Sequence, residues 1–504
     1  MFINRKGLSN LFFGQPKHPQ IPNLRATKED TLYFDSLTRG GLVIGKPGVG
    51  KTIKSVMEAV RYALEYPDRP IFSLDASGSF TNEFIQLVYQ LPREQRELIE
   101  RRIVYDRMGD QTWCVPMPYF SPDYGLQYEE QVQRVAKNYK KLNHELITLT
   151  PVMAIAITET LPELSRLLCA IQNEHGECWQ ITEAKKLLLD QNTLAIACKK
   201  FGNKVPDAKW YFENELLVEQ VTNHERERRT FTLRSVLGSI GSRPIRARLG
   251  YSKPGWTPKE AIEKGLIVLV SGEELINQEE VQAILFTDIY SQILAQINKR
   301  IPNDPNDKHV LLVIDEVYSL IRIPGMAEEI GKVSPQYRSR RLQIVVVIQA
   351  LWQLADNLKE QIWSLGNVIC FGVEDFDEAY RISQQLFKYD PTKIKLPPAS
   401  ESGHPIIEPD RGGYLIGANW IQHLKKRECI MKRYIDEGEE EPFVGYVEMT
   451  SEKPDETLVE SLVEIKDSLL RRRAIPVGDA LKIVNSRNLS QMKGKKRQTP
   501  SLNN

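Results

Sequence analysis

The segment from Gly41 to Thr52, with the sequence GLVIGKPGVGKT, constrains the fold of this chain more than any other. Its apolar first residues predict a short buried strand, which ends in a glycine-rich turn before Lys51 and Thr52. Apolar residues then recur every three or four positions from Ile53 to Leu64, which predicts an amphipathic helix. A strand, a glycine turn and a helix in this order are typical of phosphate-binding α/β proteins.

The turn matches the pattern G-x-x-x-x-G-K-[ST] in full, in which backbone N–H groups surround phosphate oxygens. The expected nucleotide-binding residues are Gly45, Lys46, Pro47, Gly48, Val49, Gly50, Lys51 and Thr52. Lys51 would reach the β and γ phosphates of ATP, and the hydroxyl of Thr52 would hold Mg²⁺. The helix that follows presents its positive end to the same anion. A glycine turn without function is the alternative, and the flanking strand and helix argue against it.

The segment HVLLVIDEVYSL supplies the second half of a nucleotide site. Its apolar run predicts a buried parallel strand, and ligands of parallel sheets bind where such strands end. Asp315 would therefore hold Mg²⁺ through water, and Glu316 is the expected base for the attacking water. The alternative is that two acidic residues merely end a strand. Their combination with the glycine loop favours hydrolysis over passive binding.

The next predicted strand, LQIVVVIQAL, has candidate site residues at both ends. Gln349 ends this strand, where a polar side chain can sense the γ phosphate or position water, or can simply belong to a turn. The preceding segment YRSRRLQ holds Arg338, Arg340 and Arg341. A basic cluster is usually a solvated surface, but one of these could reach the phosphate of a neighbouring subunit.

Strands and helices alternate on both sides of a long helical stretch. The segments RPIFSLDASGSF, RRIVYDRMG, GLIVLVSG and GNVICFGV are predicted as further strands. This alternation predicts an α/β protein with a central, mostly parallel sheet. Amphipathic stretches from about residue 126 to 250 predict an all-helical insertion. The sequence has no run of 18 apolar residues, so we expect a cytoplasmic protein without a transmembrane segment of its own.

The ordered set GKPGVGKT, SLDASGSF, VLLVIDEVYSL, YRSRRLQIVVVIQALWQL and GNVICFGVEDFDEAYRISQQL resembles the motor domain of type IV coupling proteins. These are the TraG/TraD-like members of the HerA/FtsK superfamily, which act in conjugation and type IV secretion. The resemblance covers roughly residues 31–125 and 255–420 and includes a D-x-x-G match at Asp75 to Gly78. Family members carry an arginine finger eleven residues before the strand-end Gln, which favours Arg338 over its neighbours.

The resemblance implies a RecA-like P-loop NTPase that assembles as a homo-hexamer and hydrolyses ATP with Mg²⁺ to move DNA through a ring, with turnover stimulated by DNA. The implied organisation is an N-terminal arm (1–30), a RecA-like ATPase domain (31–125 and 251–450), an inserted all-α domain (126–250) and a basic C-terminal tail (451–504) that ends in a disordered KGKKRQTPSLNN. A relaxase, a nuclease or a secretion-channel component are possible partners.

Arginines gather between residues 224 and 248, where seven Arg stand against two Glu. Backbone phosphates of DNA are neutralised by such cations without regard to sequence. The candidate DNA contacts are Arg228, Arg229, Arg234, Arg243, Arg246 and Arg248. A solvated helix face or a subunit interface explains the same charges equally well.

Two other functions remain open from the sequence. The first is a nucleotide-dependent ring scaffold that recruits a nuclease or relaxase without translocation. The second keeps the motor but moves protein or RNA. Glu316 argues against a pure switch, because a base for water serves hydrolysis.

Overall fold

The computed structural model describes residues 40–143, 147–148, 150–173, 177–218, 221–316, 318, 326, 330, 337–354, 358–359, 362–387, 411–435, 438–439, 442–447 and 456–487. The predicted arm (1–30) and the terminal KGKKRQTPSLNN lie outside these residues. The chain divides into two compact units. The first comprises Met1–Ile103, Gly265–Leu269 and Ile297–Ile465, and the second comprises Val104–Lys264, Val270–Gln296 and Lys466–Asn504.

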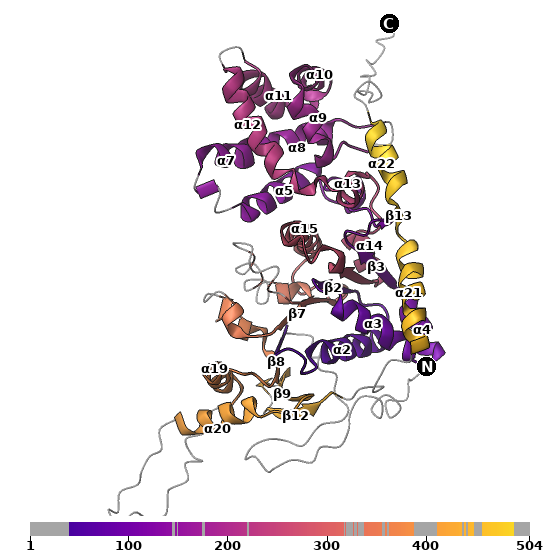
Figure 1. Ribbon diagram of the computed structural model, residues 1–504, viewed down its shortest axis with the longest axis vertical. Helices are drawn as coiled ribbons and strands as arrows, with labels where there is room; N and C mark the ends of the chain where they lie inside the picture. Colours follow the sequence, from indigo (N-terminus) through magenta and orange to yellow (C-terminus); the bar gives the residue numbers. More distant parts are fainter. Residues whose placement is uncertain are drawn as a thin grey trace, which may run out of the picture. The chain divides into compact units, whose positions relative to one another are not determined.

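A nine-stranded sheet with the order β12-β9-β8-β1-β7-β6-β2-β5-β3 organises the first unit, and its last two strands continue into the second (Figure 1). The strands are β1 (Gly41–Ile44), β2 (Ile71–Asp75), β3 (Ile103–Arg107), β5 (Ile267–Ser271), β6 (Val310–Asp315), β7 (Leu342–Ile348), β8 (Asn367–Phe371), β9 (Glu428–Lys432) and β12 (Phe443–Tyr446). The neighbours β8, β1, β7, β6 and β2 are parallel. This confirms the predicted α/β class with a mostly parallel sheet.

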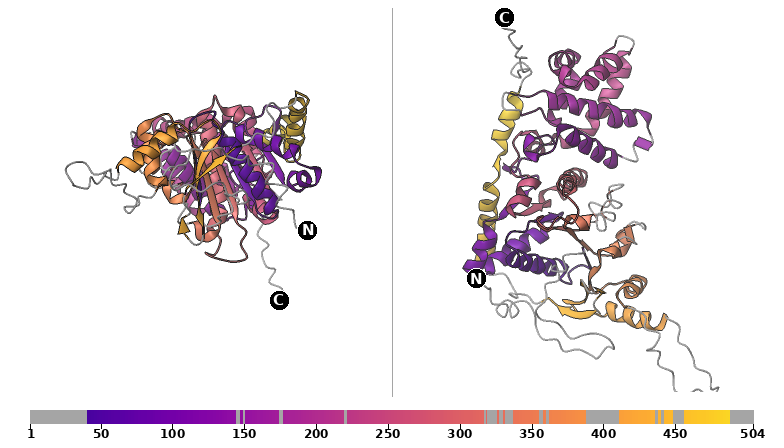
Figure 2. Two further views of the ribbon diagram at one scale, coloured as in Figure 1. Left: turned by 90° about the horizontal axis from the view of Figure 1, so that it is seen from below. Right: turned by 180° about the vertical axis from the view of Figure 1, so that it is seen from behind.

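The parallel strands are buried along their whole length, as the continuous apolar runs of the sequence predict. The described helices of this unit include α2 (Lys51–Glu65), α3 (Ser79–Gln90), α4 (Arg93–Glu100), α19 (Phe376–Leu386) and α20 (Arg411–Gln422). Helices α19 and α20 lie side by side in Figures 1 and 2, and the Ser383 hydroxyl donates to the carbonyl of Tyr414 between them. The edge strand β12 and its neighbour β9 were not predicted, and β9 pairs antiparallel with both β12 and β8.

Short helices make up most of the second unit and pack side by side from α5 to α12. They are α5 (Tyr128–Leu142), α7 (Pro151–Ile155), α8 (Leu161–Ala170), α9 (Ala184–Leu189), α10 (Gln191–Phe201), α11 (Pro206–Tyr211), α12 (Asn223–Val236), α13 (Arg243–Gly250) and α14 (Pro258–Lys264). Helix α15 (Glu279–Asn298) has its larger part here. The unit is therefore larger than the all-α insertion predicted for residues 126–250.

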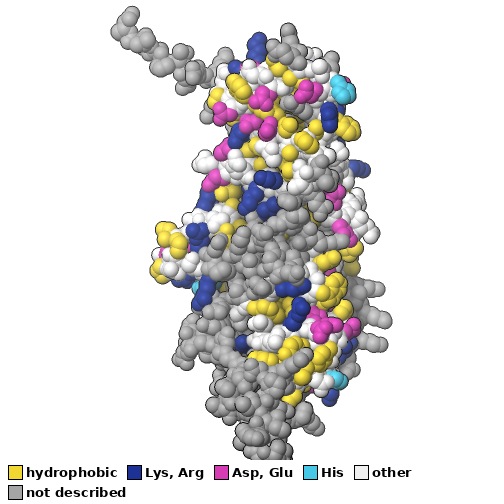
Figure 3. All heavy atoms as spheres, turned by 90° about the vertical axis from the view of Figure 1, so that its left-hand side faces the viewer, with side chains coloured by type: hydrophobic (Ala, Val, Ile, Leu, Met, Phe, Trp, Pro, Cys, Tyr) yellow, Lys and Arg dark blue, Asp and Glu magenta, His cyan; other side chains and the backbone are white. Residues whose placement is uncertain are grey.

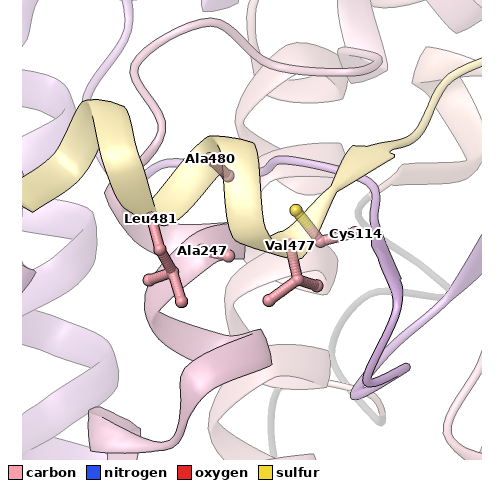
Figure 4. Packing of buried hydrophobic residues seen from close by; sticks show 5 residues of the cluster. All are labelled: Cys114, Ala247, Val477, Ala480 and Leu481. Atoms are coloured by element: carbon pink, nitrogen blue, oxygen red, sulfur yellow. The ribbon is translucent and has the colours of Figure 1, made fainter.

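The segment 456–487 is folded, which departs from the basic tail predicted for residues 451–504. It forms α21 (Glu456–Arg471), β13 (Ile475–Pro476) and α22 (Val477–Ser486). In the second unit, β13 pairs with β4 (Trp113–Cys114). Apolar residues at helical spacing on α22, including Val477 and Leu481, pack on Ala247 and Cys114 (Figure 4). This spacing was present in the sequence, but the many basic residues around it obscured it.

Candidate functional site

The glycine loop leaves β1 and packs against the end of the neighbouring β8. The N–H of Lys46 donates to the carbonyl of Gly372 over 2.9 Å. A Cβ at Gly45 would lie 2.5 Å from the Cβ of Phe371, so only glycine permits this approach. Gly50 has φ 112° and is the N-cap of α2, and because glycine has no side chain the N–H groups of the first turn receive no side-chain cap. The loop and helix therefore offer uncapped donors of the kind that bind phosphate.

Lys51 lies at the centre of this loop and is largely buried. Its Nζ donates to the carbonyls of Gly45 and Lys46 over 2.6 and 2.9 Å. Burial lowers the pKa of Lys51 to about 8, against the raising effect of Asp315 and Glu316. The ammonium therefore stays within the loop that the sequence predicted to bind phosphate, and near both predicted acidic residues.

Thr52 and Asp315 meet across the sheet. The Thr52 hydroxyl donates to Asp315 Oδ2 over 3.4 Å, although 263 residues separate the two. Asp315 ends β6 and is almost fully buried. The two residues predicted to hold Mg²⁺ are thus brought together.

A further carboxylate, Asp75, belongs to the same site and was not among the predicted site residues. It ends β2 directly opposite Asp315 in the register of the two strands. Its carboxylate accepts the N–H groups of Gly78 and Thr81, each over 2.8 Å, which explains the D-x-x-G pattern. Gly78 has φ 83° and starts α3. The signal in the sequence was a predicted strand that ends in Asp within a D-x-x-G match, whereas its pairing with the strand of Asp315 is seen only in the structure.

The carboxylates of the site are crowded and poorly compensated. Burial, followed by Asp75 and Glu316, raises the pKa of Asp315 to about 7. Burial also raises the pKa of Asp75 to about 6, despite the N–H groups that its carboxylate accepts. Glu316 adopts φ 53°, a left-handed conformation that costs about 1 kcal/mol for a non-glycine residue. Concentrated negative charge beside a hydroxyl fits a hard divalent cation, whose charge would relieve this repulsion.

The described residues contain no group of three or more His, Cys, Asp or Glu side chains placed to hold a metal. An Mg²⁺ ion held by Thr52 and Asp315 would take its other ligands from water and phosphate oxygens.

Gln349 follows β7, which lies between the strand of the glycine loop and the strand of Asp315. Ile44 pairs with Ile348, so Gly45 and Gln349 leave their strands at the same level. The N–H of Gln349 donates to Gln353 Oε1 over 3.2 Å. Position in the sheet therefore brings Gln349 to the edge that carries the other site residues.

Arg338 lies in the turn η9 (Arg338–Arg340), which precedes β7. Seven strand residues separate this turn from the edge that carries Gln349, a span of about 23 Å. Arg338 is exposed, whereas Arg340 donates to the carbonyl and side chain of Asn298 over 3.1 and 2.8 Å. Arg338 is therefore far from the glycine loop of its own chain.

The predicted DNA contacts lie on two helices of the second unit. Arg228, Arg229 and Arg234 are on α12, and Arg243, Arg246 and Arg248 are on α13. Arg228 and Arg243 are exposed. On the face drawn in Figure 3, described Lys and Arg side chains are interspersed with Asp and Glu. The Lys and Arg side chains drawn on that face therefore do not form one continuous basic surface.

Arg248 is buried, which contradicts its predicted contact with DNA. Its guanidinium donates to both carboxylate oxygens of Asp106 over 2.5 and 2.9 Å, and to the carbonyl of Val115. The indole N–H of Trp256 donates to the same carboxylate over 2.9 Å. The positive charge is used inside the second unit, where a phosphate cannot reach it.

Comparison with known proteins supports the fold. Residues 309–404 match the family described as the TraM recognition site of TraD and TraG. This range includes Asp315, Glu316, Arg338 and Gln349. No curated protein matches the sequence. None of the described helices is long and apolar enough to cross a membrane.

Solved structures of TrwB, a bacterial conjugative coupling protein, share the fold. Its complex with the non-hydrolysable GTP analogue GDPNP is 15% identical, with TM-score 0.52, over 90% of this chain and 95% of that chain. Its complex with ADP and Mg²⁺ is 14% identical, with TM-score 0.52 and the same coverage. An unbound form is 13% identical, with TM-score 0.50, over 90% of this chain and 94% of that chain. The chain therefore shares the P-loop NTPase fold of these TrwB structures.

Proposed function

We propose that this chain is the motor subunit of a coupling-protein-like machine that hydrolyses ATP to move DNA. The observation that carries the proposal is the contact of Thr52 with Asp315 beside Lys51, which brings together residues of the two predicted nucleotide motifs. The TrwB structures, which include complexes with nucleotides and Mg²⁺, support it through the shared fold. The match of residues 309–404 supports it through the sequence.

The residues of the site divide the chemistry among them. Lys51 would exchange its two carbonyl acceptors for phosphate oxygens, and the uncapped first turn of α2 would bind the same anion. Thr52 and Asp315 would hold Mg²⁺, which neutralises phosphate charge when bound. Glu316 would accept a proton from the attacking water. Gln349 would couple the presence or loss of the γ phosphate to the conformation of the turn that follows it.

Assembly into a ring would supply the arginine that the nucleotide site of a single subunit lacks. Arg338 is exposed and far from its own glycine loop, so it would complete the site of a neighbouring subunit. Hydrolysis would then require assembly, and we propose a homo-hexamer. Exposed Arg228 and Arg243, with Arg229, Arg234 and Arg246, are the proposed phosphate contacts to DNA. The region matched to a TraM recognition site is the proposed contact for a relaxase-associated partner.

A triplex-displacement assay tests translocation directly. Two substrates would each be incubated with protein and ATP. The first is duplex DNA that carries a labelled third strand, and the second is a labelled oligonucleotide that is blocked at one end. The proposal predicts ATP-dependent displacement from at least one substrate, lost with a non-hydrolysable ATP analogue. Binding without displacement of either label, together with ATP-dependent capture of a protein partner, would identify a scaffold instead.

A further inference from the structure

Three neighbouring strands of the first unit begin beside a cationic or imidazole side chain. Arg69 stands two residues before β2, His309 directly before β6 and Arg341 directly before β7. The order β7-β6-β2 and the pairing of Ile71 with Leu311 place these three strand starts next to each other. They lie at the opposite end of the strands from Asp75 and Asp315. The glycine loop is therefore at the other edge of the sheet.

The imidazole of His309 has a defined hydrogen-bonding state. Arg341 Nη1 lies 3.3 Å from His309 Nε2. Because a guanidinium can only donate, Nε2 accepts, and the proton of the neutral ring is on Nδ1. Burial, followed by Arg69, Arg341 and Arg300, lowers the pKa of His309 to about 4, so the ring is neutral near pH 7.

Two buried donors of this group have no acceptor among the described residues. They are Nδ1 of His309 and Nη1 of Arg69. Burial of a donor without an acceptor is unfavourable, so each is expected to meet a partner. The Arg69 guanidinium is held in place by stacking on the Tyr66 ring, 3.5 Å from its centroid. The orientation of this donor is thus fixed before any ligand arrives.

Positive charge exceeds negative charge at this position. Arg300 Nη1 donates to the carbonyls of Lys308 and Arg340, which fixes it beside the strand starts. Among the described residues, the carboxylate that forms an ion pair with this group belongs to Asp307. Its Oδ1 lies 3.8 Å from Arg300 Nε. Three guanidiniums against one carboxylate leave two positive charges, which match a doubly charged anion.

We propose that Arg69, Arg300, His309 and Arg341 form a phosphate-binding site separate from the glycine loop. A phosphate group accepts hydrogen bonds on several oxygens and suits planar guanidiniums. It would supply the acceptors that His309 Nδ1 and Arg69 Nη1 lack. The phosphate could be free inorganic phosphate or part of a nucleic-acid backbone. The site does not depend on the proposed hydrolysis.

Nuclear magnetic resonance of the full chain with ¹⁵N-labelled histidine tests this site. The His309 resonances are assigned with His309→Gln, and inorganic phosphate is titrated into the Lys51→Ala protein, whose glycine loop lacks its cation. We expect saturable shifts of the His309 Nδ1 signal. Arg341→Gln and, independently, Arg69→Gln should weaken phosphate binding about tenfold or more.

Arg340→Gln is the matched control, because Arg340 is in the same turn and donates to Asn298. It should bind phosphate as the parent protein does. A short DNA duplex that competes with phosphate at His309 would identify the backbone as the source, and phosphate binding without competition would identify the free ion. Absence of saturable His309 shifts with both probes, or equal affinity in the Arg341 and Arg340 variants, would overturn the proposal.

Discussion

The hydroxyl of Thr52 lies 3.4 Å from Asp315 Oδ2, although the two residues are 263 positions apart in the sequence. The contact exists because β1, β7 and β6 are adjacent and parallel, so their carboxyl ends share one edge of the sheet. Asp75 joins this edge from β2. The site is thus a consequence of strand order, and each of its residues can be tested separately.

Removal of the loop cation should weaken nucleotide binding and slow hydrolysis. In Lys51→Ala, the β and γ phosphates lose a charge-assisted donor in a buried site, so hydrolysis should fall at least about 100-fold. Nucleotide affinity, measured by fluorescence of a labelled ADP, should fall at least about tenfold. Arg93→Gln is the control, because Arg93 is an exposed residue of α4. Equal ADP affinity in Lys51→Ala and wild type would contradict the assigned role.

Neutralisation of Asp315 should stabilise the protein without ligand. The pKa of Asp315 is raised from 3.8 to about 7, so the folded state retains a proton that the unfolded state has released. This linkage lowers stability as pH rises between these two values. Asp315→Asn should therefore raise the free energy of unfolding at pH 8 by about 1–3 kcal/mol, with little change at pH 4.

Chemical denaturation at both pH values measures this effect, and Asp123→Asn, at an exposed position of the second unit, is the control. Saturating Mg²⁺ with ADP should reverse the order, because only the wild type keeps the carboxylate for the metal. A variant that is less stable than wild type at pH 8 without ligand would show that the carboxylate is already compensated.

The buried pair of Asp106 and Arg248 should matter for stability and not for phosphate binding. Arg248→Ala leaves the Asp106 carboxylate buried with one partner fewer, so it should lower the free energy of unfolding by about 3–5 kcal/mol. Arg243→Ala, on the same helix but exposed, should change stability by less than about 0.5 kcal/mol. Thermal and urea denaturation compare the two, and equal stability would be inconsistent with the buried ion pair.

Arg338 should act on a neighbouring subunit. Arg338→Ala should bind nucleotide normally but hydrolyse it about 10³-fold more slowly. A mixture of Arg338→Ala with Lys51→Ala should recover activity, because some interfaces then combine an intact loop with an intact arginine. Arg340→Ala is the matched control and should remain active. A mixture no more active than its components would rule out action in trans.

Local sequence predicted the parts of the site that depend on short motifs. The glycine loop, Asp315 and Glu316 follow from the pattern of a buried strand that ends in a polar group, and the parallel sheet follows from the alternation of elements. Asp75 was noted but not assigned, because its role depends on the pairing of β2 with β6, which no local pattern reports.

Charge patterns predicted the structure less well than the short motifs did. Arg248 looked like its exposed neighbours in the sequence, and only its partner Asp106, 142 residues away, shows that it is buried. The cluster around His309 also comes from three separate segments. Residues 456–487 contain ordinary amphipathic helices whose basic side chains suggested a tail. Burial depends on tertiary contacts, which net charge does not encode.

The most direct test of the central claim is ATP hydrolysis by the wild type and Glu316→Gln, each with no nucleic acid, with single-stranded DNA and with duplex DNA. Gln keeps the size of Glu316 but cannot accept the proton of the attacking water. The motor predicts strong stimulation by one form of DNA in the wild type and loss of that turnover in the variant, with ADP binding retained. Hydrolysis that is indifferent to every nucleic acid, or equal in both proteins, would contradict it.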